Sequence, residues 1–157
     1  MQRDAFPTIA DASTPLPAQD LEQLRIAYQA EADPTTQTQF NFAWGLIKSR
    51  STRDRRLGVQ ILTQIYHESP ERRRELVYLL ALGHFRTGEY RESRRFVDAM
   101  LGWENLEEES RLRALELRTA IEERVSLDGL IGIAIVSSLV AVVGVTVVVL
   151  WKKLKSD

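Results

Sequence analysis

The chain has 157 residues, of which 44% are hydrophobic, and its 22 acidic and 21 basic side chains give a formal net charge of −1. This length suits about one domain. The near-zero charge argues against a nucleic-acid partner, because affinity for phosphate backbones rests on a surplus of cations. The absence of Cys excludes a disulfide scaffold, a thiol nucleophile and cysteine-ligated zinc.

Residues 1–17 are predicted to form an N-terminal arm that is not helical, because three prolines interrupt the segment at positions 7, 15 and 17. The arm nevertheless carries three large apolar side chains, Phe6, Ile9 and Leu16. We expect these side chains to anchor the arm on the domain that follows.

Residues 18–127 are predicted to be a cytosolic domain built from helices, because apolar residues recur three and four positions apart almost throughout. No stretch alternates as a strand would. The predicted helices are 18–31, 36–49, 54–67, 70–86, 89–102 and 105–126.

Several helix boundaries are predicted from residues that typically cap or end helices. Ser69 and Pro70 fit an N-cap followed by a proline at the first helical position, and Asn105 fits the cap of the last helix. Gly88 is placed to end the helix before it.

The helical pattern repeats after 35 or 36 positions, as in Gly58 with Ser93 and Leu62 with Val97. This spacing resembles tetratricopeptide repeats, which have about 34 residues each. Small residues at positions 45, 58, 81 and 93 are expected to let the two helices of each hairpin approach closely. An unrelated helical bundle is the alternative. The predicted fold is therefore all-α, a six-helix bundle with two tandem tetratricopeptide-like hairpins, followed by one C-terminal membrane helix.

That membrane helix is predicted over residues 128–151, because positions 129–151 contain no charged side chain. As a helix these residues span about 35 Å, slightly more than the roughly 30 Å hydrocarbon core of a bilayer. The small-residue pairs Ala134/Ser138 and Ser137/Ala141 permit close helix contact, so the sequence leaves a homo-oligomer open.

Residues 152–157 form a short basic tail that contains Lys152, Lys153 and Lys155. A membrane span followed by only this short tail predicts a tail anchor, with residues 1–128 in the cytosol. A moderately apolar span with a basic tail is typical of the mitochondrial outer membrane, with the peroxisomal membrane as a second location. We expect the three lysines to contribute to targeting.

The sequence predicts neither an enzyme nor a cofactor site. His67 and His84 have no companion ligand at metal-binding spacing, and no glycine-rich phosphate loop or nucleophile elbow is present. The arginine clusters are interpreted as solvated helix faces rather than as lipid contacts.

Several blocks of the chain, in order, resemble the mitochondrial fission protein family, a tail-anchored adaptor family of mitochondrial and peroxisomal division. The blocks are TQFNFAWGLIKS (38–49), RLGVQILTQIY (56–66), RRRELVYLLALGHFRTGEYRESRRFVDAML (72–101) and DGLIGIAIV (128–136). Residues 6–25 also resemble the longer-armed branch of the family, in which the arm lies across a concave groove and modulates partner access.

The resemblance implies a non-enzymatic adaptor that recruits a dynamin-related GTPase, either directly or through a β-propeller adaptor. Family positions on the concave groove fall on Glu75, Leu82 and Phe85, with Tyr78 nearby. These four residues share one helical stripe by their spacing, with an ordinary core as the alternative for any one of the three apolar residues.

A second function remains open at this point, namely a co-receptor that docks chaperone C-termini for protein import. Such a receptor needs a clamp of Lys or Arg inside the groove to hold the terminal carboxylate. The predicted groove helix offers Glu75 and apolar residues instead.

Overall fold

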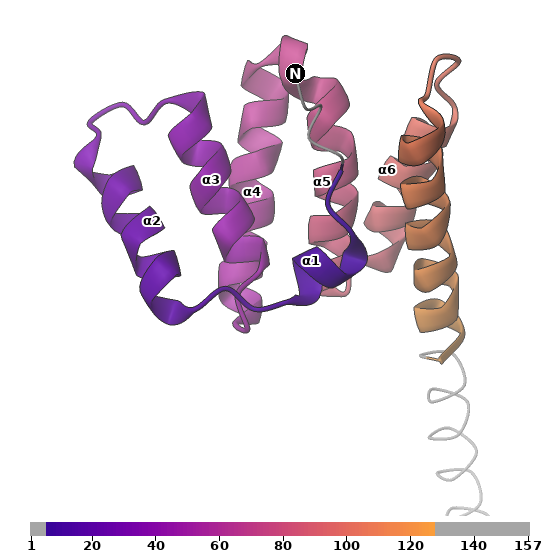
Figure 1. Cartoon of the computed structure of the whole chain (residues 1–157), viewed down its shortest axis with the longest axis horizontal. Helices are drawn as coiled ribbons and strands as arrows, with labels where there is room; N and C mark the ends of the chain where they lie inside the picture. The colour runs from indigo at the N-terminus through magenta and orange to yellow at the C-terminus, as the bar shows by residue number, and fades with distance from the viewer. Residues whose placement is uncertain (1–5, 128–157) are drawn as a thin grey trace, which may run out of the picture. The chain divides into compact units, whose positions relative to one another are not determined.

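The computed structural model describes residues 6–127, in which every regular element is helical (Figure 1). In chain order the elements are α1 (Ile9–Ser13), α2 (Ala18–Ala30), α3 (Thr36–Ile47), α4 (Thr52–Glu68), the 3₁₀ turn η1 (Pro70–Arg72), α5 (Arg73–Thr87) and α6 (Tyr90–Leu101). Residues 108–127 form a further helix, referred to below as the last helix. The all-α prediction is confirmed.

Two compact units divide the chain, and the boundary falls within the last helix. The first ends at Ile121 and the second begins at Glu122. The predicted membrane span and the lysines of the basic tail lie outside the described residues. Within residues 6–127, no helix is long and apolar enough to cross a bilayer.

The prediction that the arm contains no helix is wrong, because α1 occupies its middle. Thr8 caps α1 by accepting a hydrogen bond from the Asp11 backbone N–H at 3.0 Å, and the Asp11 carboxylate accepts one from the Thr8 N–H at 2.8 Å. This reciprocal capping box satisfies two backbone donors that a free helix end leaves without partners. The prolines lie outside α1, so they bound the helix rather than prevent it.

Two other predicted boundaries differ from the structure. Ser69 makes no side-chain cap, and Pro70 opens the 3₁₀ turn η1 instead of the α-helix, which begins at Arg73. Asn105 is not the cap of the last helix, which begins at residue 108, and its backbone carbonyl instead accepts a hydrogen bond from Arg74 at 2.7 Å. In both places the α-helix begins three residues later than predicted, at 73 instead of 70 and at 108 instead of 105.

Gly88 ends α5 as predicted. Its φ of +82° lies in the left-handed region, which is accessible to glycine at little cost. The Gly88 N–H bonds to the Phe85 carbonyl and the Glu89 N–H to the His84 carbonyl, so two free carbonyls at the helix end find donors.

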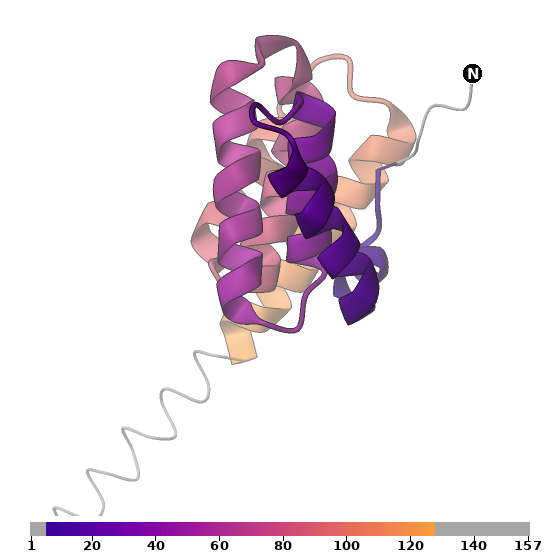
Figure 2. The same cartoon turned by 90° about the vertical axis from the view of Figure 1, so that its left-hand side faces the viewer.

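Helices α2 to α6 pack in chain order, each mainly against the next, and α3–α4 and α5–α6 are the two hairpins (Figures 1 and 2). Two small residues sit at close approaches, as predicted. A Cβ built on Gly58 would lie 2.7 Å from the Ala43 carbonyl oxygen, and the buried Ser93 hydroxyl donates to the Ala81 carbonyl at 2.7 Å. Gly45, by contrast, makes room for α2, since its nearest neighbour is Leu24 rather than α4.

The buried apolar residues form two clusters that share α5. The first joins α2, α3, α4 and one side of α5, and its fully buried members include Leu46, Leu62 and Leu80. The second joins the arm, the other side of α5, α6 and the last helix. The second cluster is the one that contains the predicted site.

Candidate functional site

Helix α5 is enclosed on all sides along its middle. Eight consecutive residues, Leu76 to Gly83, are buried. A helix that packs on one face only alternates buried and exposed positions, so an unbroken buried run requires neighbours all round. Helices α4 and α6 supply two of these neighbours, and α1 of the arm also packs against α5.

The buried apolar surface of α5 and the last helix on which the arm packs is here named the arm-covered face. Its members are mutually packed and buried, and they are Tyr78 and Leu82 of α5 with Ala114, Leu117 and Ile121 of the last helix. Ala12 of α1 is fully buried in the same cluster. The face is therefore formed by residues distant in sequence and covered by the first described helix of the chain.

The four predicted partner-binding residues divide into a covered and an exposed set. Tyr78 and Leu82 are 1% and 0% exposed, and Phe85 is partly buried, with its ring centroid 5.7 Å from that of Tyr90. Glu75 is exposed and forms an ion pair with Arg72 at 3.8 Å. The stripe predicted from the sequence thus runs from an exposed carboxylate into the second core.

The three predicted arm anchors do not all reach the same place. Phe6 and Ile9 pack against the second cluster, and the Phe6 ring centroid lies 5.0 Å from that of Tyr78. Leu16 packs against the first cluster, close to Gly45. The arm is thus fixed at two points, one in each core.

One polar atom of the arm-covered face has no partner. The Tyr78 hydroxyl is buried and makes no hydrogen bond among the described residues. Burial raises the pKa of Tyr78 far above its ordinary value, the Arg113 cation opposes this rise, and the Glu116 and Asp11 carboxylates add to it. The phenol is therefore within electrostatic reach of both the last helix and the arm.

Sequence reasoning missed the contributions of Ala12 and Arg113 to this site. Ala12 follows the visible Thr8–Asp11 capping pattern, which could have indicated a helix with an inward-facing small residue. Arg113 lies on the last helix with Glu109 and Glu116 one turn away on either side. This spacing is typical of ion pairs on an exposed helix surface. Nothing local in the sequence indicates that Arg113 lies near Tyr78.

Two family models match most of the helical domain. The Fis1 N-terminal tetratricopeptide repeat matches residues 37–69, and the Fis1 C-terminal tetratricopeptide repeat matches residues 74–130. Mitochondrial fission 1 protein of Neurospora crassa is 44% identical over 150 residues, which is 95% of both chains. The Yarrowia lipolytica protein is 43% identical over 90% of each chain.

The chain belongs to the mitochondrial fission 1 family. Among solved structures, yeast Fis1 in complex with an Mdv1 fragment superposes with a TM-score of 0.72 at 40% identity, covering 82% of this chain and 99% of that one. Yeast Fis1 complexed with a Caf4 fragment gives 0.59 at 49% identity, covering 60% and 99%. The family consists of tetratricopeptide-like adaptors of mitochondrial fission, not of enzymes.

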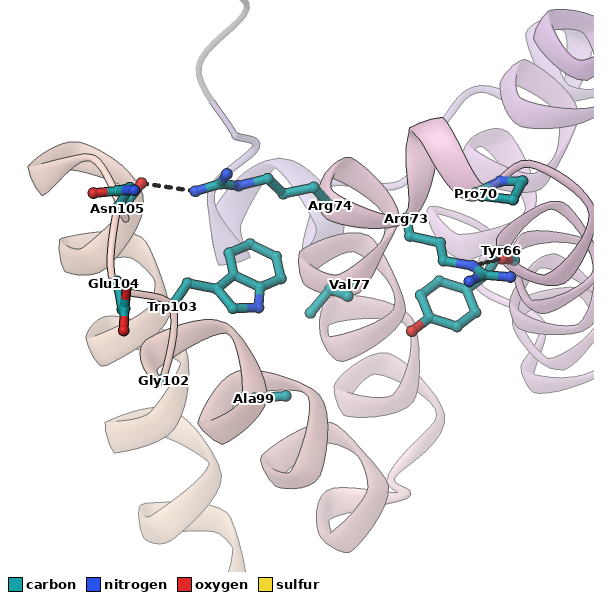
Figure 3. Close-up of a pocket in the computed structure, with 10 residues that line it drawn as sticks. All are labelled: Tyr66, Pro70, Arg73, Arg74, Val77, Ala99, Gly102, Trp103, Glu104 and Asn105. Carbon is teal, nitrogen blue, oxygen red and sulfur yellow. Dashed lines mark hydrogen bonds between the residues drawn. The ribbon is translucent and has the colours of Figure 1, made fainter.

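An open recess of this family member lies between the ends of α4, α5 and α6, with a volume of about 640 Å³ (Figure 3). Its two arginines point to opposite sides. Arg73 lies over the Tyr66 ring and donates to the Tyr66 carbonyl at 2.8 Å, whereas Arg74 lies over the Trp103 ring. These guanidinium groups brace the helix ends through aromatic and carbonyl contacts, so they are more than the solvated face that the sequence indicated.

The histidines have structural neighbours. The His84 Nδ1 lies 2.6 Å from the Glu89 carboxylate, and its ring stacks on Phe96 with centroids 5.5 Å apart. His67 contacts Tyr66 edge to face. Among residues 6–127 no group of three His, Cys, Asp or Glu side chains is arranged to hold a metal ion.

Proposed function

We propose that this chain is an adaptor that marks the outer mitochondrial membrane and recruits the division machinery through the arm-covered face of α5. The observation that carries the proposal is that a five-residue helix, α1, covers an apolar face built on α5. A cover this short can leave without dismantling the domain, since its removal exposes few side chains. The face beneath it then becomes available to an apolar segment of a partner.

The proposed partner segment is helical and belongs to a β-propeller adaptor, which in turn brings a dynamin-related GTPase. Yeast Fis1, which superposes on this chain, has been crystallised with fragments of Mdv1 and Caf4. A helix with an apolar face suits the site, because Leu82 and Phe85 present aliphatic and aromatic surface one turn apart. In this proposal the arm and the partner compete for the same face, and Glu75 lies at its exposed edge.

The membrane attachment is proposed to be residues 128–151, followed by the lysines at 152, 153 and 155. The absence of charge over positions 129–151 supports this assignment, and so does the family's association with mitochondria. The helical domain would then face the cytosol, where adaptors are available. We include the peroxisomal membrane as a second location on the same grounds of span and tail composition.

The recruitment proposal is tested by binding of the Mdv1 fragment with its N-terminal extension and coiled coil to the full chain, purified in detergent. The native chain binds, a chain lacking residues 1–13 binds more tightly, and Leu82→Asp binds at least tenfold more weakly. Ile26→Asp is the matched control, because Ile26 is 58% exposed on α2, outside the second cluster. Absence of binding both with and without the arm would show that recruitment is not the function.

The same assay separates the alternative of a chaperone co-receptor. A peptide that ends in a free carboxylate competes with the Mdv1 fragment only if the arm-covered face clamps carboxyl termini. A single cation, Arg113, acts on the Tyr78 phenol among the described residues, whereas a clamp for chain termini is a group of Lys or Arg side chains inside the groove. We therefore expect the chaperone peptide not to compete.

A further inference from the structure

Two polar atoms beside the arm-covered face are buried without hydrogen-bond partners. These atoms are the Tyr78 hydroxyl and the Nε of Arg113, and neither has an acceptor or donor within reach among the described residues. They belong to different helices that pack together, since Ala114, the chain neighbour of Arg113, lies with Tyr78 in the second cluster. The Arg113 charge accordingly opposes the rise in the Tyr78 pKa. The Nε atoms of Arg55 and Arg86 are also buried without partners, so among the described residues the Tyr78 hydroxyl is the one such atom that is not an arginine Nε. Native structures leave few buried polar groups without a partner, so this hydroxyl requires an explanation.

The arm itself cannot supply the missing partner. The side chains that it packs on this face are Phe6, Ile9 and Ala12, which are all apolar. The polar side chains of Thr8 and Asp11 already bond to each other. Asp11 Oδ2 accepts hydrogen bonds from the Thr8 N–H at 2.8 Å and from the Thr8 hydroxyl at 2.7 Å. The closed arm therefore removes water from the Tyr78 hydroxyl and returns no hydrogen bond.

Arg113 is also paired loosely. Its terminal nitrogens lie 3.9 Å from Glu109 and 3.4 Å from Glu116, distances longer than those of a well-formed charge-assisted hydrogen bond. Departure of the arm also takes away Asp11, one of the two carboxylates that act on the Tyr78 phenol. The Tyr78 O–H and the Nε–H of the cationic Arg113 guanidinium are two donors without acceptors, and together they match a carboxylate.

We propose that the Tyr78 hydroxyl and the Arg113 guanidinium are a latent recognition pair, unsatisfied beneath the arm and hydrogen-bonded to a side-chain carboxylate of the partner segment that replaces it. The proposal rests on the function proposed above for the arm-covered face. It adds a chemical requirement for the partner, an Asp or Glu within its apolar helix face. It also assigns a regulatory role to one atom, because the unsatisfied hydroxyl weakens the closed state.

The first test measures arm closure in the full chain without any partner. Hydrogen exchange at the α1 amides reports arm opening, since the Ala12 and Thr14 N–H groups bond to the Thr8 and Ala10 carbonyls. Tyr78→Phe removes only the orphan hydroxyl, so exchange should slow by about tenfold, in line with the usual penalty for such a group. Tyr28→Phe is the matched control, because Tyr28 packs on Phe42 in the other cluster, and it should leave α1 exchange unchanged.

The second test measures affinity for the Mdv1 fragment. Tyr78→Phe should weaken binding by about tenfold in the chain lacking residues 1–13, where stabilisation of the arm cannot contribute. Arg113→Lys keeps the charge but loses the Nε donor, and it should weaken binding in the same background, whereas Arg111→Lys should not. The effects of Tyr78→Phe and Arg113→Lys should be less than additive, because both remove bonds to one carboxylate.

The outcomes separate this inference from the function on which it rests. Unchanged or faster α1 exchange in Tyr78→Phe would show that the hydroxyl is satisfied beneath the arm and would overturn the inference. Unchanged or tighter fragment binding by both variants would overturn the part of the inference that concerns recognition of a partner carboxylate. Failure of the native chain to bind the fragment would overturn both the proposed function and the recognition of a partner carboxylate. The exchange result would still decide whether the Tyr78 hydroxyl weakens arm closure.

Discussion

The two cores of the domain are closed by different kinds of element. The first, around α3 and α4, is closed by α2, a helix of 13 residues that contributes Leu21 to the buried cluster. The second, around α5 and α6, is closed partly by α1, a helix of five residues with one fully buried side chain, Ala12. The two covers therefore differ in length by eight residues.

The difference in cover length assigns stability mainly to one core and partner binding to the other. A longer cover with more packed side chains opens only when the domain unfolds, whereas a short one opens locally at lower free energy. The first core therefore stabilises the domain as a whole. The second core does so in part, and it also contains the arm-covered face, which local opening of α1 exposes.

The largest expected effect compares a buried leucine from each core. Leu62→Ala should lower the free energy of unfolding by about 2–5 kcal/mol, because Leu62 is fully buried in the first cluster between α2, α3, α4 and α5. Leu82→Ala should cost about 2 kcal/mol or less, since the small arm helix can settle into the vacated space. Urea denaturation of both variants measures the difference.

Deletion of residues 1–13 sharpens the same comparison. Without the arm Leu82 is partly exposed already, so the cost of Leu82→Ala should shrink, while the cost of Leu62→Ala should stay the same. If the deletion changed both costs equally, the two cores would not be independent, and the distinction between a fixed and a removable cover would be wrong.

The next effect compares two glycines at helix contacts. A Cβ on Gly58 would meet the Ala43 backbone carbonyl at 2.7 Å, so Gly58→Ala must push α4 away from α3 and should cost about 1–3 kcal/mol. A Cβ on Gly83 would meet the ends of the Val59 and Ile47 side chains, at 2.8 and 3.2 Å, and those ends can rotate. Gly83→Ala should therefore cost less, and equal losses in thermal unfolding would contradict the assignment.

Much of the helical architecture could be predicted from the sequence because it depends on local pattern. The three- and four-residue spacing located six of the helices, and Gly88 marked the end of α5 through its left-handed backbone. The small helix α1 was missed because the prolines were read as breaking the whole arm. The residues from Thr8 to Thr14 contain no proline, and their capping box needs only local contacts.

The site could be predicted in part for a related reason. Tyr78, Leu82 and Phe85 lie on one helix, so their spacing alone placed them on one stripe. The orphan hydroxyl and its relation to Arg113 could not be predicted, because Tyr78 and the helix that carries Arg113 come together only through tertiary packing. The separation of Leu16 from Phe6 and Ile9 likewise depends on α2 and Gly45, which no spacing within the arm reveals.

The smallest expected effect concerns acid and the arm. Hydrogen bonds from the Thr8 backbone and side chain hold the pKa of Asp11 below its ordinary value of 3.8. A lowered carboxyl pKa means that the capping box stabilises the arm fully above that ordinary value, and that this stabilisation is lost as the pH falls through the lower value in the folded chain. The arm should therefore loosen below about pH 4, before the first core changes.

A fluorinated phenylalanine at position 6 reports this loosening through its ¹⁹F signal, because Phe6 packs on Tyr78. Asp11→Asn should show a looser arm at neutral pH and no further acid response between pH 6 and 3. The Glu31 carboxyl is the control, because Thr35 and Thr38 lower its pKa in the same way but at the α2–α3 loop. Glu31→Gln should leave the Phe6 signal unchanged at neutral pH, and an acid response that survived in Asp11→Asn would show that another group closes the arm.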